Sequence, residues 1–141
     1  MSLKQDTNNI RVGDVYLVKF SGIGNEQKGW RPGLVFQNNT GNQHSPNIIM
    51  LPLTSSMKKS SLPTHVTIPK EVGLRMDSVV LCENPERMSK ERLGSYLTTL
   101  PDEYMCKVAI ANLLSSSAIA FINPDVLMAV WQKAIYLNNV A

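Results

Sequence analysis

The stretch that most constrains this chain runs from residue 22 to residue 38 and reads Gly-Ile-Gly-Asn-Glu-Gln-Lys-Gly-Trp-Arg-Pro-Gly-Leu-Val-Phe-Gln-Asn. Its early glycines indicate a polar loop that a ligand can approach closely. Pro32 fixes its own φ and favours an extended Arg31, and the apolar residues 34–36 then anchor the segment as a strand. A loop joined to a firmly mounted arginine is typical of an anion-binding or phosphoryl-transfer site. A solvated hairpin connection is the alternative that the same pattern allows.

Short runs of strand-forming residues lie on both sides of this stretch. They predict strands over residues 12–20, 32–37, 47–53, 64–68 and 78–82, with a further strand over 95–99. Turn-forming residues separate these runs, notably at 38–42 and at Gly73. Strands this short, joined by turns, are typical of a mainly β fold built as a small antiparallel barrel or curled sheet.

Helices are predicted late in the chain. Pro101 and the acidic pair that follows it favour a helix start, and the pattern predicts a helix over residues 101–114 after one short turn over 89–93. The apolar stripe of this helix comprises Met105, Val108, Ala109 and Leu113. The fold is therefore expected to carry a helix after the sheet.

The chain continues into an extra C-terminal helical extension, residues 118–141, with a cap and a proline at Asn123-Pro124. One face of this extension is apolar and comprises Val126, Leu127, Val130, Trp131, Ala134 and Leu137. Packing on its own domain is the expected use of such a stripe, and a second copy or a partner protein is the alternative. At the other end, residues 1–10 are polar and are expected to form a flexible N-terminus.

The composition is that of an ordinary globular chain. Its 141 residues favour one domain, and 43% hydrophobic with 18% charged residues excludes a disordered class. The net charge of +3 and the pI near 9.0 permit a polyanionic partner without requiring one.

Cysteine use and hydropathy indicate a reducing, aqueous compartment. Cys82 and Cys106 fit neither a metal-site spacing nor a disulfide framework, and both are expected in or near the core. No signal-peptide pattern is visible, and no apolar run approaches the roughly 20 residues of a membrane span. These features predict a cytoplasmic protein with no membrane association.

Several motifs, in order along the chain, resemble one family. Residues 26–38, Glu-Gln-Lys-Gly-Trp-Arg-Pro-Gly-Leu-Val-Phe-Gln-Asn, resemble the signature of the MazF/PemK toxin family, the small ribonucleases of bacterial toxin–antitoxin pairs. The segments at 13–16, 45–46 with 53–55, 62–66 and 77–83 resemble the further strands of that family. The resemblance covers about residues 11–115, which we take as the MazF/PemK-like domain, and implies an SH3-like or CcdB-like antiparallel barrel.

The resemblance also implies an activity. It indicates the toxin component of a toxin–antitoxin system, a metal-independent, sequence-specific endoribonuclease that cleaves single-stranded RNA to a 2′,3′-cyclic phosphate and a 5′-hydroxyl without any cofactor. It places Arg31 and Thr54 at the catalytic centre, where a guanidinium can bind phosphate in bidentate fashion and a hydroxyl can donate to the same group. Arginine is effectively never deprotonated, so Glu26 is carried as a candidate base.

RNA binding is expected from polar and aromatic residues around this centre. The candidates are Gln27, Lys28, Trp30, Asn38, Ser55, Asn84 and Arg87. Trp30 suits base stacking, and a half-buried anchor for the loop is the equal alternative. His44 and His65 share no spacing, and each is expected to be structural or exposed.

The expected partners are single-stranded RNA, a cognate antitoxin and a second copy in a homodimer, with operator DNA bound only through the antitoxin complex. One departure from the family affects these expectations: Asn84-Pro85-Glu86-Arg87 stands where the family commonly has Gln-Ile-Arg-Thr. Two alternatives stay open, the first suggested by the tail that carries Trp131 and the second by Pro85-Glu86. One is a non-enzymatic toxin of the same fold that binds DNA gyrase through its C-terminal helix, and the other is a catalytically inactive RNA- or antitoxin-binding homologue.

Overall fold

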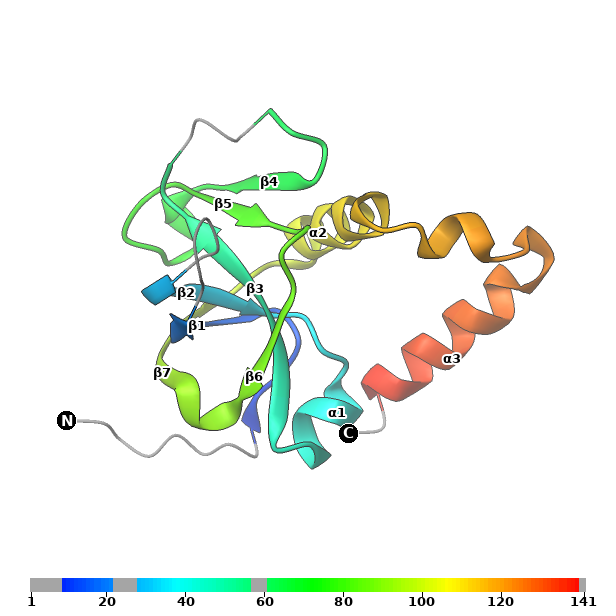
Figure 1. The fold of residues 1–141 in the computed structure, drawn as a ribbon, viewed down its shortest axis with the longest axis horizontal. Helices are drawn as coiled ribbons and strands as arrows, with labels where there is room; N and C mark the ends of the chain where they lie inside the picture. Colours follow the sequence, from blue (N-terminus) through cyan, green and yellow to red (C-terminus); the bar gives the residue numbers. More distant parts are fainter. Residues whose placement is uncertain (1–8, 22–27, 57–60, 140–141) are drawn as a thin grey trace.

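The computed structural model describes residues 9–21, 28–56 and 61–139 of the chain (Figure 1). The strands of this part are β1 (Asp14–Ser21), β2 (Lys28–Val35), β3 (Asn47–Thr54), β4 (His65–Ile68), β5 (Ser78–Leu81), β6 (Glu86–Ser89) and β7 (Leu93–Thr99). Its helices are α1 (Asn39–His44), α2 (Asp102–Ser115) and α3 (Leu127–Asn139). Short 3-10 turns lie at η3 (Lys70–Val72), η4 (Lys90–Arg92), η5 (Ala118–Phe121) and η6 (Pro124–Val126).

The strands form one antiparallel sheet in the order β4-β5-β3-β2-β1-β7. β3 is its centre: β2 pairs with one edge of β3, while β5 and β6 share the other edge, β5 near Thr54 and β6 along residues 47–50. The predicted mainly β fold with helices after the sheet is confirmed. The described strands curl without closing into a complete barrel.

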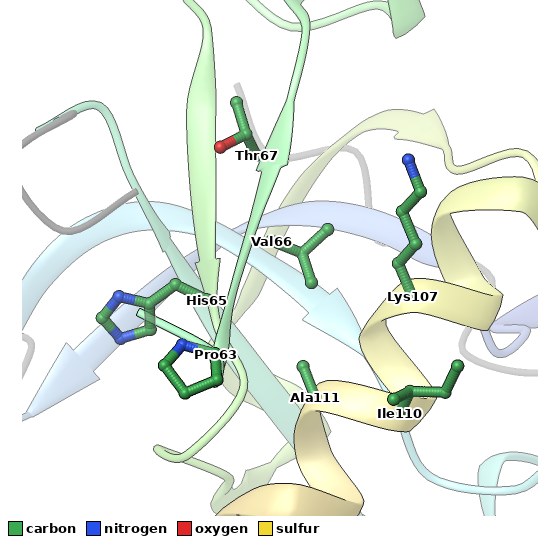
Figure 2. A pocket seen from close by; sticks show the side chains of 7 residues that line it. All are labelled: Pro63, His65, Val66, Thr67, Lys107, Ile110 and Ala111. Atoms are coloured by element: carbon green, nitrogen blue, oxygen red, sulfur yellow. The ribbon is translucent and has the colours of Figure 1, made fainter. Parts of the chain in front are cut away.

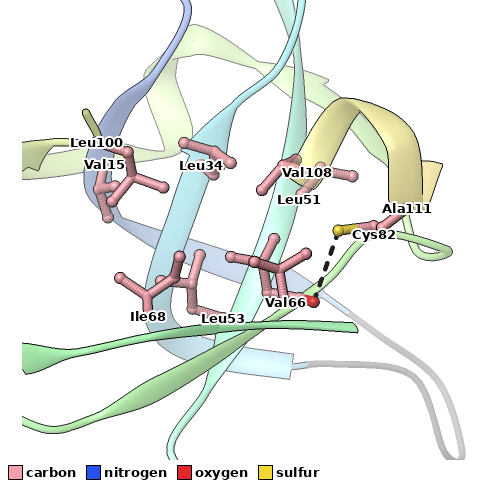
Figure 3. Close-up of a cluster of buried hydrophobic side chains, with 11 residues drawn as sticks. Val15, Leu34, Leu51, Leu53, Val66, Ile68, Cys82, Leu100, Val108 and Ala111 are labelled. Atoms are coloured by element: carbon pink, nitrogen blue, oxygen red, sulfur yellow. Dashed lines mark hydrogen bonds between the residues drawn. The ribbon is translucent and has the colours of Figure 1, made fainter. Parts of the chain in front are cut away.

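Two apolar cores lie on opposite faces of the sheet, because alternate residues of β1 point to opposite sides. One core joins the sheet to α2 and comprises Val15, Leu34, Leu51, Leu53, Val66, Ile68, Val80, Cys82, Leu100, Val108 and Ala111 (Figure 3). The other comprises Ile10, Tyr16, Val18, Phe20, Val35, Ile48, Met50 and Met88. Residues 1–8 of the predicted flexible terminus lie outside the described residues, whereas Ile10 is buried in the second core.

Gly33 of β2 pairs with Pro52 of β3, and neighbouring side chains approach it closely. A Cβ atom added at Gly33 would lie 3.1 Å from both Met50 Cε and Val18 Cγ2. A larger residue at position 33 would therefore require the Met50 or Val18 side chain to shift by a few tenths of an ångström. β2 also begins earlier than the predicted start at Pro32: its backbone pairs with β1 from Lys28 opposite Ser21 onward. Arg31 and Pro32 are thus inside a strand.

Residues 38–42, predicted as a turn, instead lead into α1. Asn38 caps this helix by accepting a hydrogen bond from Gly41 N at 2.9 Å. The Asn42 side chain donates to Gln37 O at 2.9 Å and is buried. Asparagine side chains that satisfy nearby backbone groups favour helix caps as well as turns, so composition alone pointed to the wrong element.

Pro85 and Glu86 do not simply end the fifth strand. They lead into β6, a strand absent from our prediction, in which Glu86 pairs with Met50 and Ser89 with Asn47. Only Met88 is buried among its residues, and a four-residue strand with one apolar side chain carries no readable alternation. The departure at residues 84–87 therefore alters a strand that pairs with β3.

The C-terminal helix forms as expected. Its apolar stripe does not pack on its own domain, so the predicted packing of the stripe is wrong for the single chain. In Figure 1 the chain leaves α2, passes through η5 and η6, and returns along α3 so that only the end of α3 meets α1. Asn39 N donates to Asn138 Oδ1 at 2.9 Å, Asn39 Nδ2 donates to Asn138 O at 3.1 Å, and Thr40 Oγ1 donates to Leu137 O at 2.6 Å. Polar contacts at one end thus hold a helix in which no residue is buried.

The packed line of α2 is narrower than the predicted stripe. Val108 and Ala111 are buried with Tyr104 and Met105 beside them, while Ala109 and Leu113 are exposed. The helix therefore meets β4 along a single i, i+3/i+4 line. Cys106 lies off that line and is exposed, so its predicted near-core position is wrong, whereas Cys82 is buried.

The two thiols are expected to differ sharply in reactivity. Burial, and then the charge of Glu83, raise the pKa of Cys82 to about 12, so almost no thiolate forms there at pH 8. We expect a thiol reagent to modify one equivalent in the native protein at pH 8, at Cys106, and a second only on unfolding. Mass spectrometry of the labelled peptides measures this, and Cys106→Ser is the control that should leave the native protein unlabelled. Rapid labelling of both thiols in the folded chain would contradict the burial of Cys82.

Candidate functional site

A pocket of about 600 Å³ lies beyond the last paired residues of β2 and β3. Leucines form much of its apolar lining: Leu17, Leu53, Leu74 and Leu97. Its polar and charged lining comprises Arg31, Thr54, Ser55, Arg75, Ser78 and Ser95. No acidic residue is among the described residues that line it, so two guanidinium groups set its charge. Such a lining suits a ligand that is both anionic and partly apolar.

The register of the sheet explains why Arg31 and Thr54 reach this pocket together. Gly33 pairs with Pro52 and Leu34 with Leu51, so the same antiparallel register carried two residues further sets Arg31 opposite Thr54. The described ladder stops at Gly33, and the pocket lies where the pairing stops. Arg31 is held on its other side by β1, where it pairs with Val18.

Thr54 is the last residue of β3 and pairs with Val79 of β5. Its Oγ1 accepts a hydrogen bond from Ser56 N at 3.2 Å. A hydroxyl that accepts from the backbone keeps its own hydrogen available as a donor, and this bond fixes the oxygen in place. Thr54 therefore combines the local backbone bond expected of a strand-end threonine with a hydroxyl at a pocket lined by two arginines.

Trp30 has the exposed ring that base stacking requires and also the close packing expected of a loop anchor. Its indole is 56% exposed and belongs to the pocket lining. At the same time a Cβ atom added at Gly94 would lie 3.0 Å from Trp30 Cζ3, so the ring rests closely against the β7 backbone. The Cζ3 edge of the ring is thus supported, and the exposed remainder is available for stacking.

Arg75 is a lining residue that the sequence analysis missed. It lies in a tight connection before β5, in which Gly73 N and Leu74 N donate to Lys70 O at 2.9 and 3.0 Å. Lys70 N in turn donates to Asp77 Oδ1 at 2.8 Å. Gly73 at φ +121° allows the turn that brings Arg75 to the pocket. The signal in the sequence was the glycine two residues before an arginine, which we interpreted only as a break before a strand.

Several predicted RNA-binding residues lie away from this pocket. Ser55 joins Arg31 and Thr54 in its lining, but Asn38 caps α1 at the opposite end of the β2–β3 pair. Asn84 is exposed in the turn after β5. Glu26 and Gln27 lie outside the described residues, and Lys28 contributes only its backbone pairing to what the structure describes.

Arg87 belongs to a separate pocket of about 350 Å³. It lies in β6 opposite Ile49, and the other lining residues are Ser21, Asn47, Glu86, Met88, Ser89 and Arg92. Ser21 is the last described residue before segment 22–27, which separates β1 from β2. Ser21 pairs with Lys28 of β2, so this pocket borders the β1 side of the β1–β2 pair near residues 21 and 28. The lining of this pocket contains Glu86 as well as Arg87 and Arg92, so the pocket carries charges of both signs.

The histidines lie apart from each other. His44 is exposed in α1, whereas His65 is buried in β4 with its Nε2 atom 2.6 Å from Glu83 Oε1. His65 also borders a surface hollow of about 370 Å³ between β4 and α2, with Lys107 and Ile110 on the helix side (Figure 2). His44 and His65 therefore do not form the paired arrangement used in two-histidine RNA cleavage.

Two further features of the described residues bear on other classes of function. No group of three or more His, Cys, Asp or Glu side chains in residues 9–21, 28–56 and 61–139 is placed to hold a metal ion. Across the same residues, none of the helices has the length and apolar character needed to cross a bilayer.

Comparison with known proteins identifies the class. Residues 11–113 match the family described as PemK-like, MazF-like toxin of type II toxin-antitoxin system. Endoribonuclease EndoA of Bacillus subtilis (strain 168) is 43% identical over 114 residues, covering 79% of this chain and 98% of that protein. The chain belongs to the PemK/MazF-like toxin family, as its motifs predicted.

Solved structures give the same fold. MazF from Deinococcus radiodurans aligns with a TM-score of 0.66 at 23% identity, covering 80% of this chain and 97% of that one. A mycobacterial endoribonuclease in complex with its cognate antitoxin aligns with a TM-score of 0.62 at 25% identity, covering 82% of this chain and 99% of that one. The family match ends at residue 113, so α3 lies beyond it.

The Gly73 turn is expected to be needed for the pocket. In Gly73→Ala, a Cβ atom would lie 2.7 Å from Thr98 Oγ1, and φ +121° is strained for alanine. We expect a loss of about 1–3 kcal/mol in the free energy of unfolding. Chemical denaturation measures this change. Glu71→Ala, at an exposed position of the neighbouring turn, is the matched control, and equal stability of the two variants would contradict the strain.

Proposed function

We propose that this chain is the toxin of a type II toxin–antitoxin pair and acts as a metal-independent endoribonuclease on single-stranded RNA. The observation that carries this proposal is the meeting of Arg31 and Thr54 in one pocket, set by the β2–β3 register. The 43% identity to a protein named endoribonuclease EndoA supports the same reaction class. The scissile phosphate is the group that the two side chains bind.

The reaction is an internal transfer at phosphorus. The ribose 2′-oxygen attacks the adjacent phosphorus, and the bond from phosphorus to the 5′-oxygen of the next nucleotide breaks. A base takes the 2′-hydroxyl proton, and the leaving 5′-oxygen gains a proton. The products are a 2′,3′-cyclic phosphate and a free 5′-hydroxyl.

The protein's part in this reaction is to stabilise charge on the phosphate. Arg31 donates two hydrogen bonds from its planar fork to the non-bridging oxygens, and Thr54 donates its hydroxyl to the same group. Arg75 adds a second positive charge from the facing loop. The leucines limit the water around these groups, which strengthens each charge interaction.

Glu26 is our candidate for the general base. A guanidinium keeps its proton at any working pH, so Arg31 serves as a donor rather than a base. A carboxylate in the segment between β1 and β2 is close in sequence to both Trp30 and Arg31. We assign the proton transfer from the 2′-hydroxyl to Glu26 and the electrostatic role to Arg31.

RNA is held by stacking and by the two pockets in succession. Trp30 stacks on one base while its other edge rests on Gly94. Ser55 binds beside Thr54, and Gln27 and Lys28 add contacts from the segment before Trp30. Arg87 and Asn84 bind the strand further along. Asn38, as the cap of α1, is too distant from this path to be retained as an RNA contact.

The proposed partners follow from the same pocket. A cognate antitoxin inhibits by placing acidic and apolar side chains against Arg31, Arg75 and the leucines. The active form is a homodimer, and operator DNA is bound only through the antitoxin complex. The gyrase-binding and inactive alternatives are not favoured, because the chain retains both the Arg31–Thr54 pocket and its identity to EndoA.

Removal of either central group is expected to reduce cleavage strongly. Loss of one preorganised donor to a developing negative charge costs about 10²–10³-fold in rate. We expect Arg31→Ala and Thr54→Val each to fall by that order on a mixed-sequence RNA in EDTA. Arg31→Lys should retain part of the activity, because the charge stays and the bidentate geometry is lost. End mapping of the products measures both the rate and the bond broken.

The control for this series is Lys133→Ala, a cation exposed on α3 and far along the chain from the pocket. It should cleave as the parent does. Equal cutting by Arg31→Ala and the parent would overturn the assignment and point to a contaminating nuclease. Products with a 3′-hydroxyl would overturn the proposed chemistry even if Arg31 proved essential.

Stacking at Trp30 can be separated from its anchoring role. Trp30→Phe keeps an aromatic face, whereas Trp30→Ala removes both stacking and packing, and base–aromatic stacking is worth about 1–3 kcal/mol. We expect Trp30→Ala to weaken RNA binding by roughly tenfold or more and Trp30→Phe to weaken it much less. Binding is measured by fluorescence anisotropy in an Arg31→Ala background. Equal losses in both variants would indicate that the indole serves only to anchor β7.

A further inference from the structure

Strand β7 forms one wall of the Arg31–Thr54 pocket, to which it contributes Ser95 and Leu97. Its pairing with β1 is interrupted twice along this wall. The paired residues on either side of the interruptions are Val15 with Thr98, Tyr16 with Tyr96, and Val18 with Leu93. β7 therefore carries an extra residue in each interval, in the segments that contain Leu97 and Ser95. Such bulges increase the local twist of a strand and redirect its side chains, and they are common beside active sites.

Tyr96 fixes the orientation of this wall. Successive side chains of a strand point to opposite faces, and Tyr96, between the two lining residues, meets the Tyr16 ring edge-on with the ring centroids 5.7 Å apart. The Tyr96 hydroxyl lies 2.7 Å from Thr99 Oγ1, which donates to Asp14 Oδ1 at 2.8 Å. Ser95 therefore faces the pocket from a strand that is held firmly on its other face.

Gly94 leaves the space in which the Trp30 indole lies. A Cβ atom added at Gly94 would lie 3.0 Å from Trp30 Cζ3 and 2.9 Å from Leu17 O. Gly94 is not among the glycines with positive φ, so lack of space rather than backbone conformation demands a glycine here. Glycine inside a strand otherwise weakens it and often marks a close approach of this kind. The ring is thus seated on β7 at the residue before Ser95.

The Ser95 hydroxyl is available to a ligand. Two other hydroxyls of the lining are held by the backbone: Ser78 Oγ donates to Met76 O at 2.9 Å, and Thr54 Oγ1 accepts from Ser56 N at 3.2 Å. Ser95 is exposed, and within residues 9–21, 28–56 and 61–139 no protein group is hydrogen-bonded to its hydroxyl. A serine hydroxyl offers one donor and two acceptor lone pairs. The sequence analysis assigned this residue no role.

We propose that Ser95 determines base specificity by donating a hydrogen bond to the exocyclic oxygen of a uracil or guanine stacked on Trp30. This inference rests on the proposed nuclease function and names the base that the pocket accepts. In the proposed reaction Arg31 binds the cleaved phosphate, and Trp30 is the preceding residue of the same strand. The base on Trp30 therefore belongs to a nucleotide that flanks the cut.

The charge of the lining decides which base fits. Uracil and guanine carry a carbonyl oxygen where cytosine and adenine carry an amine. The Ser95 hydroxyl alone can pair with either group. Arg31 and Arg75 supply positive charge, and no acidic side chain is among the described residues of the lining. This field favours the partial negative charge of a carbonyl oxygen over an amine.

The test separates base preference from cleavage rate. The full-length protein cuts random-sequence single-stranded RNA, and sequencing of the new ends gives the base preference at each position around the cut. The parent should prefer uracil or guanine at one position that flanks the cut. Ser95→Val should reduce that preference by about 2–10-fold, the value of one neutral hydrogen bond, and leave the more distant positions unchanged.

Ser95→Thr is the matched control, because threonine has the shape of valine and keeps the hydroxyl. It should retain the parent's preference. Ser117→Ala, at an exposed serine just after α2 and outside the lining, should match the parent in both rate and preference. An unchanged profile in Ser95→Val, equal losses in the valine and threonine variants, or a parent preference for adenine or cytosine at both flanking positions would overturn the proposal and leave the nuclease function intact.

A binding selection distinguishes failure of the base preference from failure of the nuclease function. The same RNA pool is selected for binding to Arg31→Ala, with and without Ser95→Val, so that no cutting is required. Enrichment of uracil or guanine that depends on Ser95, together with no cleavage by the parent, would overturn the nuclease function alone. Absence of both binding and cleavage would overturn both proposals.

Discussion

The pairing of β2 with β3 around Gly33 is the constraint on which the pocket depends. The side chains of Val18 and Met50 lie so close to Gly33 that a Cβ atom added there would be 3.1 Å from Val18 Cγ2 and from Met50 Cε. The register of this pairing brings Arg31 and Thr54 to the same end of the two strands. A slip of one residue would turn Arg31 to the other face of the sheet. The chemistry therefore depends on packing in the second core, on the opposite side from α2.

The pocket combines two environments that rarely share a surface. Four leucines line it, and two guanidinium groups supply charge, with no acidic side chain among the described residues of the lining. Low polarity strengthens the attraction between a guanidinium and a phosphate, while the planar fork keeps the geometry fixed. A nucleotide presents the matching pair of features, because its base has an apolar face and its phosphate is anionic. The loop at Gly73 and the strand at Arg31 supply the two cations from opposite sides of the chain's central strand β3.

Much of the fold could be predicted because local sequence patterns determine its strands and helices. Alternation in β1 and the apolar run of β3 predicted those strands, and Pro101 with its acids predicted α2. Side chains that hydrogen-bond to backbone groups far away in the sequence could not be predicted in the same way. Asn39 joins Val12 N, at 2.8 Å, to Asn138 at the far end of the chain, and nothing in the segment 38–42 indicates that role. Arg31 and Thr54 were found through family resemblance, whereas Arg75 was missed because its position depends on the left-handed turn at Gly73 rather than on any motif. The α3 stripe was recognised, but the domain that carries it does not cover it in the described chain.

The two ends of the β2–β3 hairpin contact different parts of the molecule. Its connected end holds α1 and, through Asn39 and Thr40, the end of α3. Its open end holds Arg31 and Thr54. β3 alone has eight residues, so these ends lie ~23 Å apart at about 3.3 Å per residue. Exposed charges are screened over about 8 Å at physiological ionic strength. A charge that a bound protein brings to the tail is thus largely screened from the pocket of Arg31 and Thr54. Contacts at one end of the hairpin can therefore change with little electrostatic effect at the other end.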